Sequence, residues 1–354
     1  MGGCSVREHE RNGFAAVTLE NDALAATFLP GRGAELHALV DKARGVDLLW
    51  KSPWNPGRQP ASLPLAEAGS EAAWLDQYGG GWQFLFPNAG DACEYRGARL
   101  NFHGEASVRQ WDYQVVRHDA AAVEVRFELA TSRGPFHVIR TIRVERGRPV
   151  ILFEESIRNL GEEDHHYMWG HHPAFGAPFL DEGCRLTIPA RRYLAHDVEI
   201  SEHARVAAGT RGSWPLVPGR DGTPVDLSVW PERGRRVTEF GYLCELDAGW
   251  YALQNGALGL GFGLAWPKEV FPYVWFWQEL RGSFGYPWYG RSYVAAVEPF
   301  TSMPGSGLVK AIECGTAPLL RAGANVNARL AAVLLGPEPV HGISIDGEVA
   351  SRAG

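Results

Sequence analysis

The sequence predicts an all-β protein built as a sandwich or a barrel. The chain of 354 residues contains 13 Trp, 11 Tyr and 16 Phe, and aromatic residues favour strands. It also contains 42 Gly and 23 Pro, which favour many turns. No segment shows a helical period longer than about two turns. Many short strands joined by turns are typical of packed or closed antiparallel sheets.

The first part of the chain consists of short apolar runs separated by turn signals. Strands are expected at residues 13–19, 23–29, 35–40, 46–50 and 82–86. Residues 51–80 contain Pro, Gly and Ser with little period, and a long loop with room for one helical turn is expected there.

From residue 107 onward the runs become longer and their spacing more regular, as in an antiparallel meander. Strands are expected at 108–116, 122–130, 136–145, 150–159, 165–169, 186–193, 241–254, 257–265, 273–279, 293–298, 310–314 and 325–335. No linker divides the chain. We therefore expect one antiparallel β-domain over residues 1–335, followed by a polar, Gly- and Pro-rich C-terminal tail over 336–354.

Composition excludes several classes of function. The formal net charge is −7 without a long basic run, so nucleic acid is not an expected partner. No stretch approaches ~18 consecutive apolar residues, so no membrane span is expected. The five cysteines are widely spaced and form no CxxC pair, which favours a reducing compartment. A cytoplasmic protein is the simplest interpretation.

Residues 164–172 contain His165, His166, His171 and His172, a density that suggests metal binding. Side chains alternate between the two faces of a strand, so each adjacent pair is split across faces. Neither an HxH motif with a following Glu nor an HExxH motif is present. We therefore expect no metal site here, and His171 should point away from His172.

Two segments far apart in the chain provide an imidazole and a carboxylate, each followed by proline. They are His172-Pro173 and Glu298-Pro299. Proline biases the preceding residue to an extended conformation, so both side chains are expected at stiff strand ends. A carboxyl group at the end of a buried strand can have a raised pKa, which suits a general base. Alone, His172 would more often be an ordinary strand-end histidine satisfied by backbone, and Glu298 is equally compatible with an ordinary carboxylate at the rim.

Further candidates are consistent with a sugar site. His103 precedes Gly104, which would allow close approach of a ligand, but it is also compatible with a turn. Aromatic rings can cover the apolar C–H faces of sugars, and the candidates include Trp288 and Tyr289. Strand alternation puts Trp275, Trp277 and Glu279 on one face. Aromatic residues of this kind are more often part of the core.

At these residues the chain resembles the aldose 1-epimerase (mutarotase) family of the galactose mutarotase-like superfamily. The resemblance runs in order over residues 14–335. It is carried by four segments: Gly80-Gly81-Trp82-Gln83-Phe84-Leu85-Phe86-Pro87-Asn88, Phe102-His103-Gly104-Glu105, His172-Pro173-Ala174-Phe175 and Glu298-Pro299-Phe300-Thr301. The Asp-His pair that holds sugar hydroxyls in well-studied members is missing between residues 200 and 270, and Gly79 stands where the hexose-phosphate type has Arg. The chain thus looks like a divergent branch.

The resemblance implies a large twisted antiparallel β-sandwich with a site in a concave groove and no cofactor. Glu298 would remove the proton of the anomeric hydroxyl, and protonated His172 would give one to the ring oxygen. His103 would hydrogen-bond the sugar, and Asn88, Trp275, Trp277 and Glu279 would contribute to binding. A monomer or homodimer acting on a small sugar is expected.

Two other classes remain open at this point. One is a non-catalytic sugar-binding protein on the same fold. The other is a carbohydrate hydrolase or lyase, although hydrolysis generally needs two carboxylates flanking the bond. The sugar is not identified by the sequence; Arg32, Arg109 and Arg281 would be the candidate contacts if it were anionic.

Overall fold

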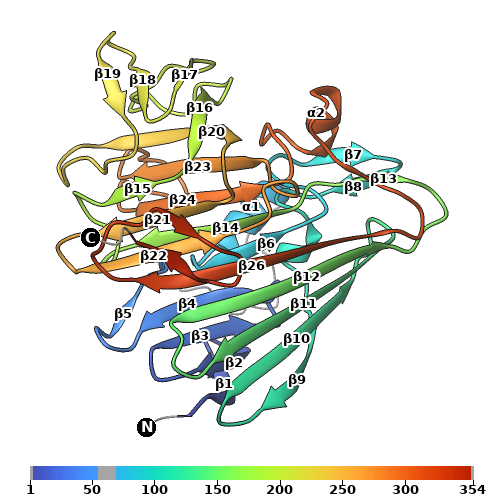
Figure 1. The fold of residues 1–354 in the computed structure, drawn as a ribbon. Coiled ribbons are helices and arrows are strands. Elements are labelled where there is room, and N and C mark those ends of the chain that lie inside the picture. The colour runs from blue at the N-terminus through green and yellow to red at the C-terminus, as the bar shows by residue number, and fades with distance from the viewer. Residues whose placement is uncertain (1–2, 55–68, 352–354) are drawn as a thin grey trace.

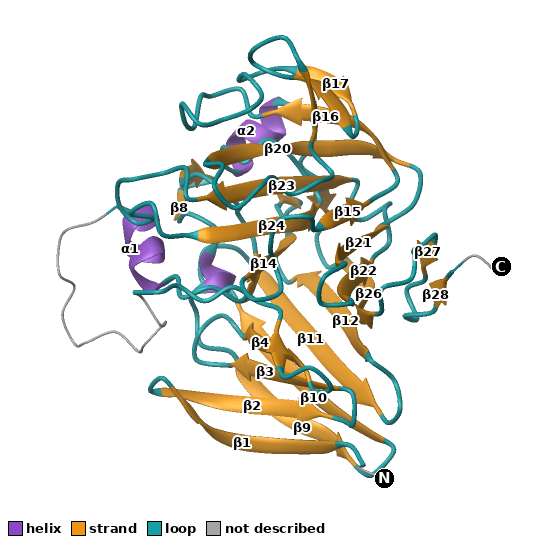
Figure 2. Cartoon of the chain, turned by 90° about the vertical axis from the view of Figure 1, so that its left-hand side faces the viewer, coloured by secondary structure: helices purple, strands orange, loops and turns teal. Residues whose placement is uncertain are grey.

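The protein contains two large antiparallel sheets that pack against each other (Figure 1). The computed structural model describes residues 3–54 and 69–351. The expected all-β class and the sandwich architecture are both confirmed. Figure 2, turned by 90° from this view, shows the first sheet running from β16 and β17 at the top to β1 and β2 at the bottom, with helix α1 at the left.

The first sheet is twelve-stranded and carries the candidate site. Its strands follow the order β1-β2-β3-β4-β6-β14-β24-β23-β20-β16-β17, and β5 pairs with β4. Their bounds are β1 Ser5–Arg11, β2 Phe14–Glu20, β3 Leu24–Leu29, β4 Glu35–Asp41, β5 Val46–Asp47, β6 Trp82–Leu85, β14 Gly170–Gly176, β16 Ala190–Ala195, β17 Arg211–Ser213, β20 Val237–Leu246, β23 Tyr273–Leu280 and β24 Tyr293–Phe300.

The second sheet is eight-stranded, in the order β15-β21-β22-β26-β12-β11-β10-β9. Its bounds are β9 Asp112–His118, β10 Ala122–Ala130, β11 Phe136–Glu145, β12 Val150–Asn159, β15 Arg185–Thr187, β21 Trp250–Asn255, β22 Leu260–Ala265 and β26 Asn325–Leu335. Along β11 every second residue is buried, as expected for a sheet with one face against a core.

Shorter elements join the sheets. Two-stranded pairs are formed by β7 Cys93–Tyr95 with β8 Ala98–Leu100, β13 His165–His166 with β25 Leu319–Leu320, β18 Leu216–Pro218 with β19 Pro224–Asp226, and β27 Gly342–Ile343 with β28 Val349–Ala350. The helical segments are α1 Ser70–Gln77, η1 Glu105–Ser107 and α2 Leu308–Glu313.

Several expected elements differ from the structure. The strand expected at 310–314 is helix α2, because a short apolar run fits either structure. The strand expected at 241–254 is two strands, β20 and β21, separated by a turn. The loop expected at 51–80 includes helix α1, which has eight residues. Residues 55–68 of the expected loop lie outside the described part of the chain.

The expected C-terminal tail contains the β27–β28 hairpin. Val340 and Ile343 of this segment are buried against residues of β22 and β26, so the tail packs on the second sheet. The division of the chain at residue 335 remains a prediction.

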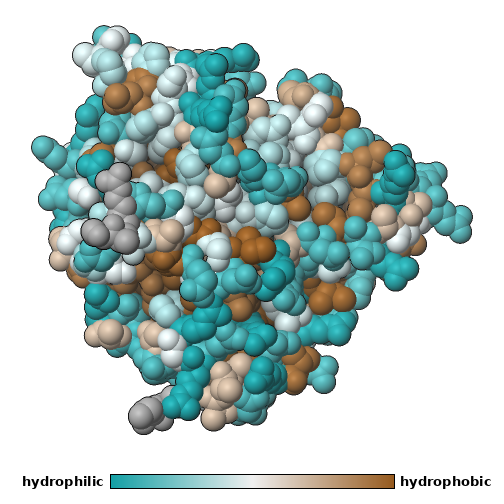
Figure 3. Space-filling model, in the orientation of Figure 1, coloured by the Kyte–Doolittle hydropathy of each residue, from teal (hydrophilic) through white to brown (hydrophobic). Residues whose placement is uncertain are grey.

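The surface in the view of Figure 3 is mainly hydrophilic, with apolar atoms gathered near its centre. Among the described residues no helix is long and apolar enough to cross a membrane.

Candidate active site

His172 and Glu298 lie on adjacent strands of the first sheet. The register of β14 and β24 pairs Gly170 with Phe300 and Ala174 with Ala296, so His172 falls directly opposite Glu298. Side chains directly opposite each other in an antiparallel pair share a face. His172 Nε2 is 3.9 Å from Glu298 Oε1. The two segments are therefore brought together, as the sequence predicted.

Both residues lie within strands, which corrects the expectation that they sit at strand ends. Pro173 is inside β14 and Pro299 is inside β24. A proline cannot donate a ladder hydrogen bond, and the described pairing between β14 and β24 is interrupted over this stretch. The other neighbours keep the strands in place, because β6 pairs with β14 and β23 pairs with β24.

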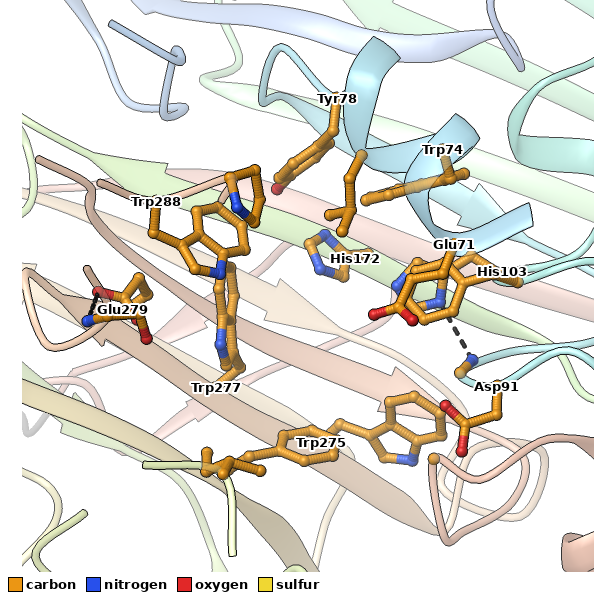
Figure 4. A pocket seen from close by; sticks show the side chains of 18 of the residues that line it. Glu71, Trp74, Tyr78, Asp91, His103, His172, Trp275, Trp277, Glu279 and Trp288 are labelled. Atoms are coloured by element: carbon orange, nitrogen blue, oxygen red, sulfur yellow. Dashed lines mark hydrogen bonds between the residues drawn. The ribbon is translucent and has the colours of Figure 1, made fainter. Parts of the chain in front are cut away.

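The pair lies in a pocket of about 590 Å³ on the face of the first sheet that points away from the second sheet (Figure 4). His103, Trp275, Trp277 and Glu279 also line this pocket. The structure therefore brings these residues, which were predicted from the sequence, together with His172 and Glu298. The remaining lining residues are Glu71, Ala72, Trp74, Leu75, Tyr78, Gly90, Asp91, Phe102, His196, Ile200, Thr238, Phe240, Ser283, Tyr286, Pro287, Trp288 and Gly305.

Burial shifts the pKa values of both members of the pair toward their neutral forms. It lowers the pKa of His172 to about 4 and raises the pKa of Glu298 well above its ordinary value. Burial thus favours a neutral imidazole and a protonated carboxyl. This differs from the protonated His172 and ionised Glu298 that the resemblance implies, although the pair carries one proton in either form.

Polar atoms of the pair are buried without a partner. Nδ1 of His172 and Oε2 of Glu298 have no hydrogen bond to any part of the chain that the structure describes, and neither has the hydroxyl of Tyr78, which also lines the pocket. Buried polar atoms normally find partners. Unsatisfied donors and acceptors at the floor of a pocket are therefore suited to a polar ligand.

His103 is held in a defined tautomer beside the pair. Its Nδ1 accepts a hydrogen bond of 3.1 Å from the backbone N–H of Gly90, so the ring proton is on Nε2. Burial, and to a lesser degree the nearby His172, lowers the pKa of His103 well below its ordinary value. The ring centres of His103 and His172 are 5.8 Å apart. A neutral His103 can thus donate a hydrogen bond to a ligand oxygen.

The segment before η1 fixes His103 through backbone conformation. Gly104 has φ +72°, and a Cβ there would lie 2.4 Å from the carbonyl oxygen of Phe86. A residue with a side chain would clash at this position. Gly104 therefore allows the close backbone approach that puts the His103 ring into the pocket.

Aromatic side chains form the floor and walls. Trp275 stacks on Phe300 with 3.8 Å between ring centres, and Gly170 makes room for Phe300, because a Cβ there would lie 2.1 Å from its ring. Trp277 lies beside Trp288 at 5.3 Å. The apolar floor surrounds His172 and Glu298 and explains the burial that shifts their pKa values.

Two predicted binding residues have their polar groups occupied by the protein. Asn88 is fully buried outside the pocket, where its side chain binds the carbonyls of Asp91 and Asn101 and accepts from the Leu308 N–H. Its side chain therefore fixes the loops beside the pocket and does not line it, and a direct role in binding stays a prediction. Glu279 lines the pocket but accepts four hydrogen bonds from protein groups.

Helix α1 supplies lining residues that sequence reasoning missed. Trp74 and Tyr78 stack with 4.5 Å between ring centres, and Trp74 meets the ring of His103 at 4.6 Å. The spacing of Glu71, Trp74 and Tyr78 follows a helical period. This spacing is a signal for a helix that could have been read from the sequence, but it spans only two turns.

Of the other histidines of the cluster, His171 points into the interior, as expected. Its Nδ1 accepts from the indole N–H of Trp82 and its Nε2 is 3.1 Å from Glu155 of the second sheet. His165 and His166 belong to the separate strand β13. Among the described residues, no cluster of His, Cys, Asp or Glu is arranged to hold a metal ion.

None of the three candidate anion contacts lines the pocket. Arg32 is buried and faces Glu35 at 3.4 Å, Arg109 faces Glu105 at 3.7 Å, and the Arg281 guanidinium lies over the ring of Tyr293. Each has a partner elsewhere in the protein.

A family model described as a domain of unknown function, DUF4432, matches residues 11–213. The chain belongs to this family. The match covers more than half of the chain and includes His103 and His172, while Glu298 lies beyond it. No protein of curated function matches the sequence significantly.

Solved structures with the same fold are numerous and distant in sequence. A protein of Klebsiella pneumoniae, named provisionally as an aldose 1-epimerase, is 18% identical with a TM-score of 0.70, over 93% of this chain and 82% of its own. A galactose mutarotase-like protein of Clostridium acetobutylicum is 16% identical with a TM-score of 0.63, over 94% and 99%. Slr1438 of Synechocystis is 16% identical with a TM-score of 0.61, over 94% and 96%. This DUF4432 protein therefore has the mutarotase-like sandwich fold, as the sequence predicted.

Proposed function

We propose that this protein interconverts the α and β anomers of an aldose by general acid–base catalysis. The observation that carries the proposal is the His172–Glu298 pair, buried opposite each other with unpaired polar atoms in one pocket. Ring opening needs removal of the proton from the anomeric hydroxyl and delivery of a proton to the ring oxygen. A pair that carries one proton in total meets both needs.

Substrate binding reconciles the pKa shifts with the acid and base roles. In the empty pocket burial favours neutral His172 and protonated Glu298. A sugar hydroxyl that donates to Glu298 and a ring oxygen that accepts from His172 would favour the ionised forms, since hydrogen bonds to a charged group stabilise it. The proton then lies on His172 without any change in the charge of the pair.

The cycle follows from these positions. Glu298 accepts the proton of the anomeric hydroxyl while His172 gives its proton to the ring oxygen, and the ring opens to the aldehyde. Rotation about the C1–C2 bond and closure on the other carbonyl face return both protons. His103, with its proton on Nε2, donates a hydrogen bond to the sugar near the anomeric carbon. General acid–base help is typically worth ~10²–10⁴-fold.

The names of solved proteins with the same fold support this reaction class. The Klebsiella and Clostridium proteins are named for aldose epimerisation and for likeness to galactose mutarotase. The arrangement favours an isomerase over a hydrolase, because Glu279, the other buried carboxylate in the pocket, has both oxygens bonded to protein groups. Hydrolysis generally uses two available carboxylates.

The test is an NMR anomer-exchange screen with the purified full chain over a panel of aldoses. We expect exchange between α and β signals to become faster than the uncatalysed rate for at least one sugar. A sugar that binds by calorimetry without faster exchange would instead support the non-catalytic binding protein. That result would contradict the proposal.

A further inference from the structure

The pocket is longer than its catalytic part. The pair lies on β14 and β24, whereas Trp277 is on β23 and Phe240 and Thr238 are on β20, all lining the same pocket. Strands in a sheet are roughly 4.8 Å apart, so the floor from β14 to β20 measures about 14 Å. One pyranose ring over the pair leaves the β23–β20 half of this floor uncovered.

The same extension is seen along the strand. Trp275 is opposite Glu298 in the pairing of β23 with β24, while Glu279 is four residues further along β23. At about 3.4 Å per residue this separates them by roughly 14 Å. Figure 4 shows Glu279 and Trp277 on one side of His172, and His103 and Asp91 on the other. The total volume of about 590 Å³ is in the range that holds drug-sized ligands.

The far half has the chemistry of a sugar subsite. Trp277 and Trp288, with ring centres 5.3 Å apart, form an aromatic wall for the C–H face of a ring. Beyond them lies a group that we call the distal cluster: Thr238, Glu279 and Ser283. The Thr238 and Ser283 hydroxyls are 3.0 and 2.7 Å from Glu279 Oε2 and donate to it. Their oxygens keep acceptor capacity for ligand hydroxyls.

The charge of the described lining residues disfavours an anionic ligand. Glu71, Asp91 and Glu279 line the pocket as carboxylates, and no Lys or Arg lines it within residues 3–54 and 69–351. A phosphate, sulfonate or carboxylate would meet carboxylates without a compensating cation. Burying an unpaired charge is unfavourable.

From these observations we infer that the substrate is an uncharged reducing disaccharide. Its reducing-end ring lies over His172 and Glu298, and its second ring lies between the Trp277–Trp288 wall and the distal cluster. The inference rests on the proposed function and adds the substrate class.

The experiment compares maltose and cellobiose with glucose as NMR anomer-exchange substrates. We expect kcat/KM to be at least about 10-fold higher for one of the disaccharides than for glucose. Equal or better catalysis with glucose would overturn the inference while leaving the proposed function intact. Faster exchange with none of these sugars, nor with any aldose in a wider screen, would overturn both.

Two further arms test the subsite and its charge. Trp288→Ala should lower the disaccharide-to-glucose ratio of kcat/KM by about 3–10-fold, the size of one aromatic contact. Phe284→Ala is the matched control, because Phe284 lies on the same loop, is 52% exposed and does not line the pocket; it should leave the ratio unchanged. Equal losses in both variants would overturn the subsite.

The charge arm uses glucuronic acid against glucose. We expect kcat/KM for the acid to be at least about 10-fold lower, because its carboxylate enters an acidic pocket. Equal or higher values would overturn the requirement for an uncharged sugar.

Discussion

The two faces of strand β14 carry a histidine–glutamate pair each, and the two pairs are built for different purposes. On the inner face His171 is 3.1 Å from Glu155, whose other oxygen is bound by Arg140 at 2.8 Å, and all three are buried. On the pocket face His172 is 3.9 Å from Glu298, and within the described residues no arginine lines the pocket beside them. The inner carboxylate has the Arg140 guanidinium as its counter-ion, whereas the pocket carboxyl has no such cation among the described lining residues.

The pKa shifts follow this difference. His171 and Arg140 outweigh burial and lower the pKa of Glu155, while burial alone raises the pKa of Glu298. A compensated carboxylate stays ionised and holds the two sheets together. An uncompensated carboxyl keeps its proton to higher pH. Residue type alone therefore does not distinguish the proposed catalytic pair from the structural one; the missing counter-ion does.

The difference between the two faces of β14 is tested most directly by removing one histidine from each face. His172→Asn should lower kcat by ~10²–10⁴-fold because the proton donor is lost, with the fold retained. His171→Asn should keep activity per folded molecule within about 10-fold but lower stability, because Glu155 loses a partner. Activity is measured by NMR exchange and folding by thermal melts. Equal activity losses in the two variants would mean that the faces are not distinct.

The inner pair can be tested through its arginine. Arg140→Met should destabilise the protein by about 3–5 kcal/mol, because it leaves a buried carboxylate without its cation. Urea denaturation measures the change. A loss below about 1 kcal/mol would contradict the structural role of this pair.

Part of the fold and of the site could be predicted from the sequence. The strands at 122–130, 136–145, 150–159 and 325–335 were predicted with the bounds that the structure has, because long alternating runs have a clear period. His172 and Glu298 were found because proline follows each. The same prolines led to the wrong expectation of strand ends, since the neighbouring strands that hold β14 and β24 in place are distant in sequence.

Other parts of the site could not be predicted. Trp74 lies in an eight-residue helix and Tyr78 directly follows it, in a stretch with little period, and only the fold brings them to His172. The structural bonds of Asn88 reach Leu308, far along the chain. Contacts of this kind depend on tertiary packing.

The pH dependence of kcat/KM tests whether the pocket pair shares one proton. Catalysis needs one proton on the pocket pair. It should fall below about pH 4, where His172 with its pKa of about 4 takes up a second proton, and again at high pH, where Glu298 loses its proton. Each limb should change kcat/KM about 10-fold per pH unit. A profile that is flat from pH 3 to the alkaline range would contradict the shared proton.

The smallest expected effect concerns stability. The pKa of Glu298 is raised on folding, so the folded protein becomes less stable as pH rises above about 4.3, the unfolded value. Glu298→Gln removes this cost and should raise Tm by about 2–4 °C at pH 8, with a smaller gain at pH 5. Thermal melts at both pH values measure it. A larger gain at pH 5 would reverse the sign and contradict the shift.

The most direct test of the proton-transfer pair is the exchange rate of Glu298→Gln against the wild-type chain on the best sugar from the screen. Both proteins are compared at equal folded concentration. The proposal predicts a decrease in kcat of ~10²–10⁴-fold with an intact thermal transition. Undiminished anomer exchange in Glu298→Gln would contradict it.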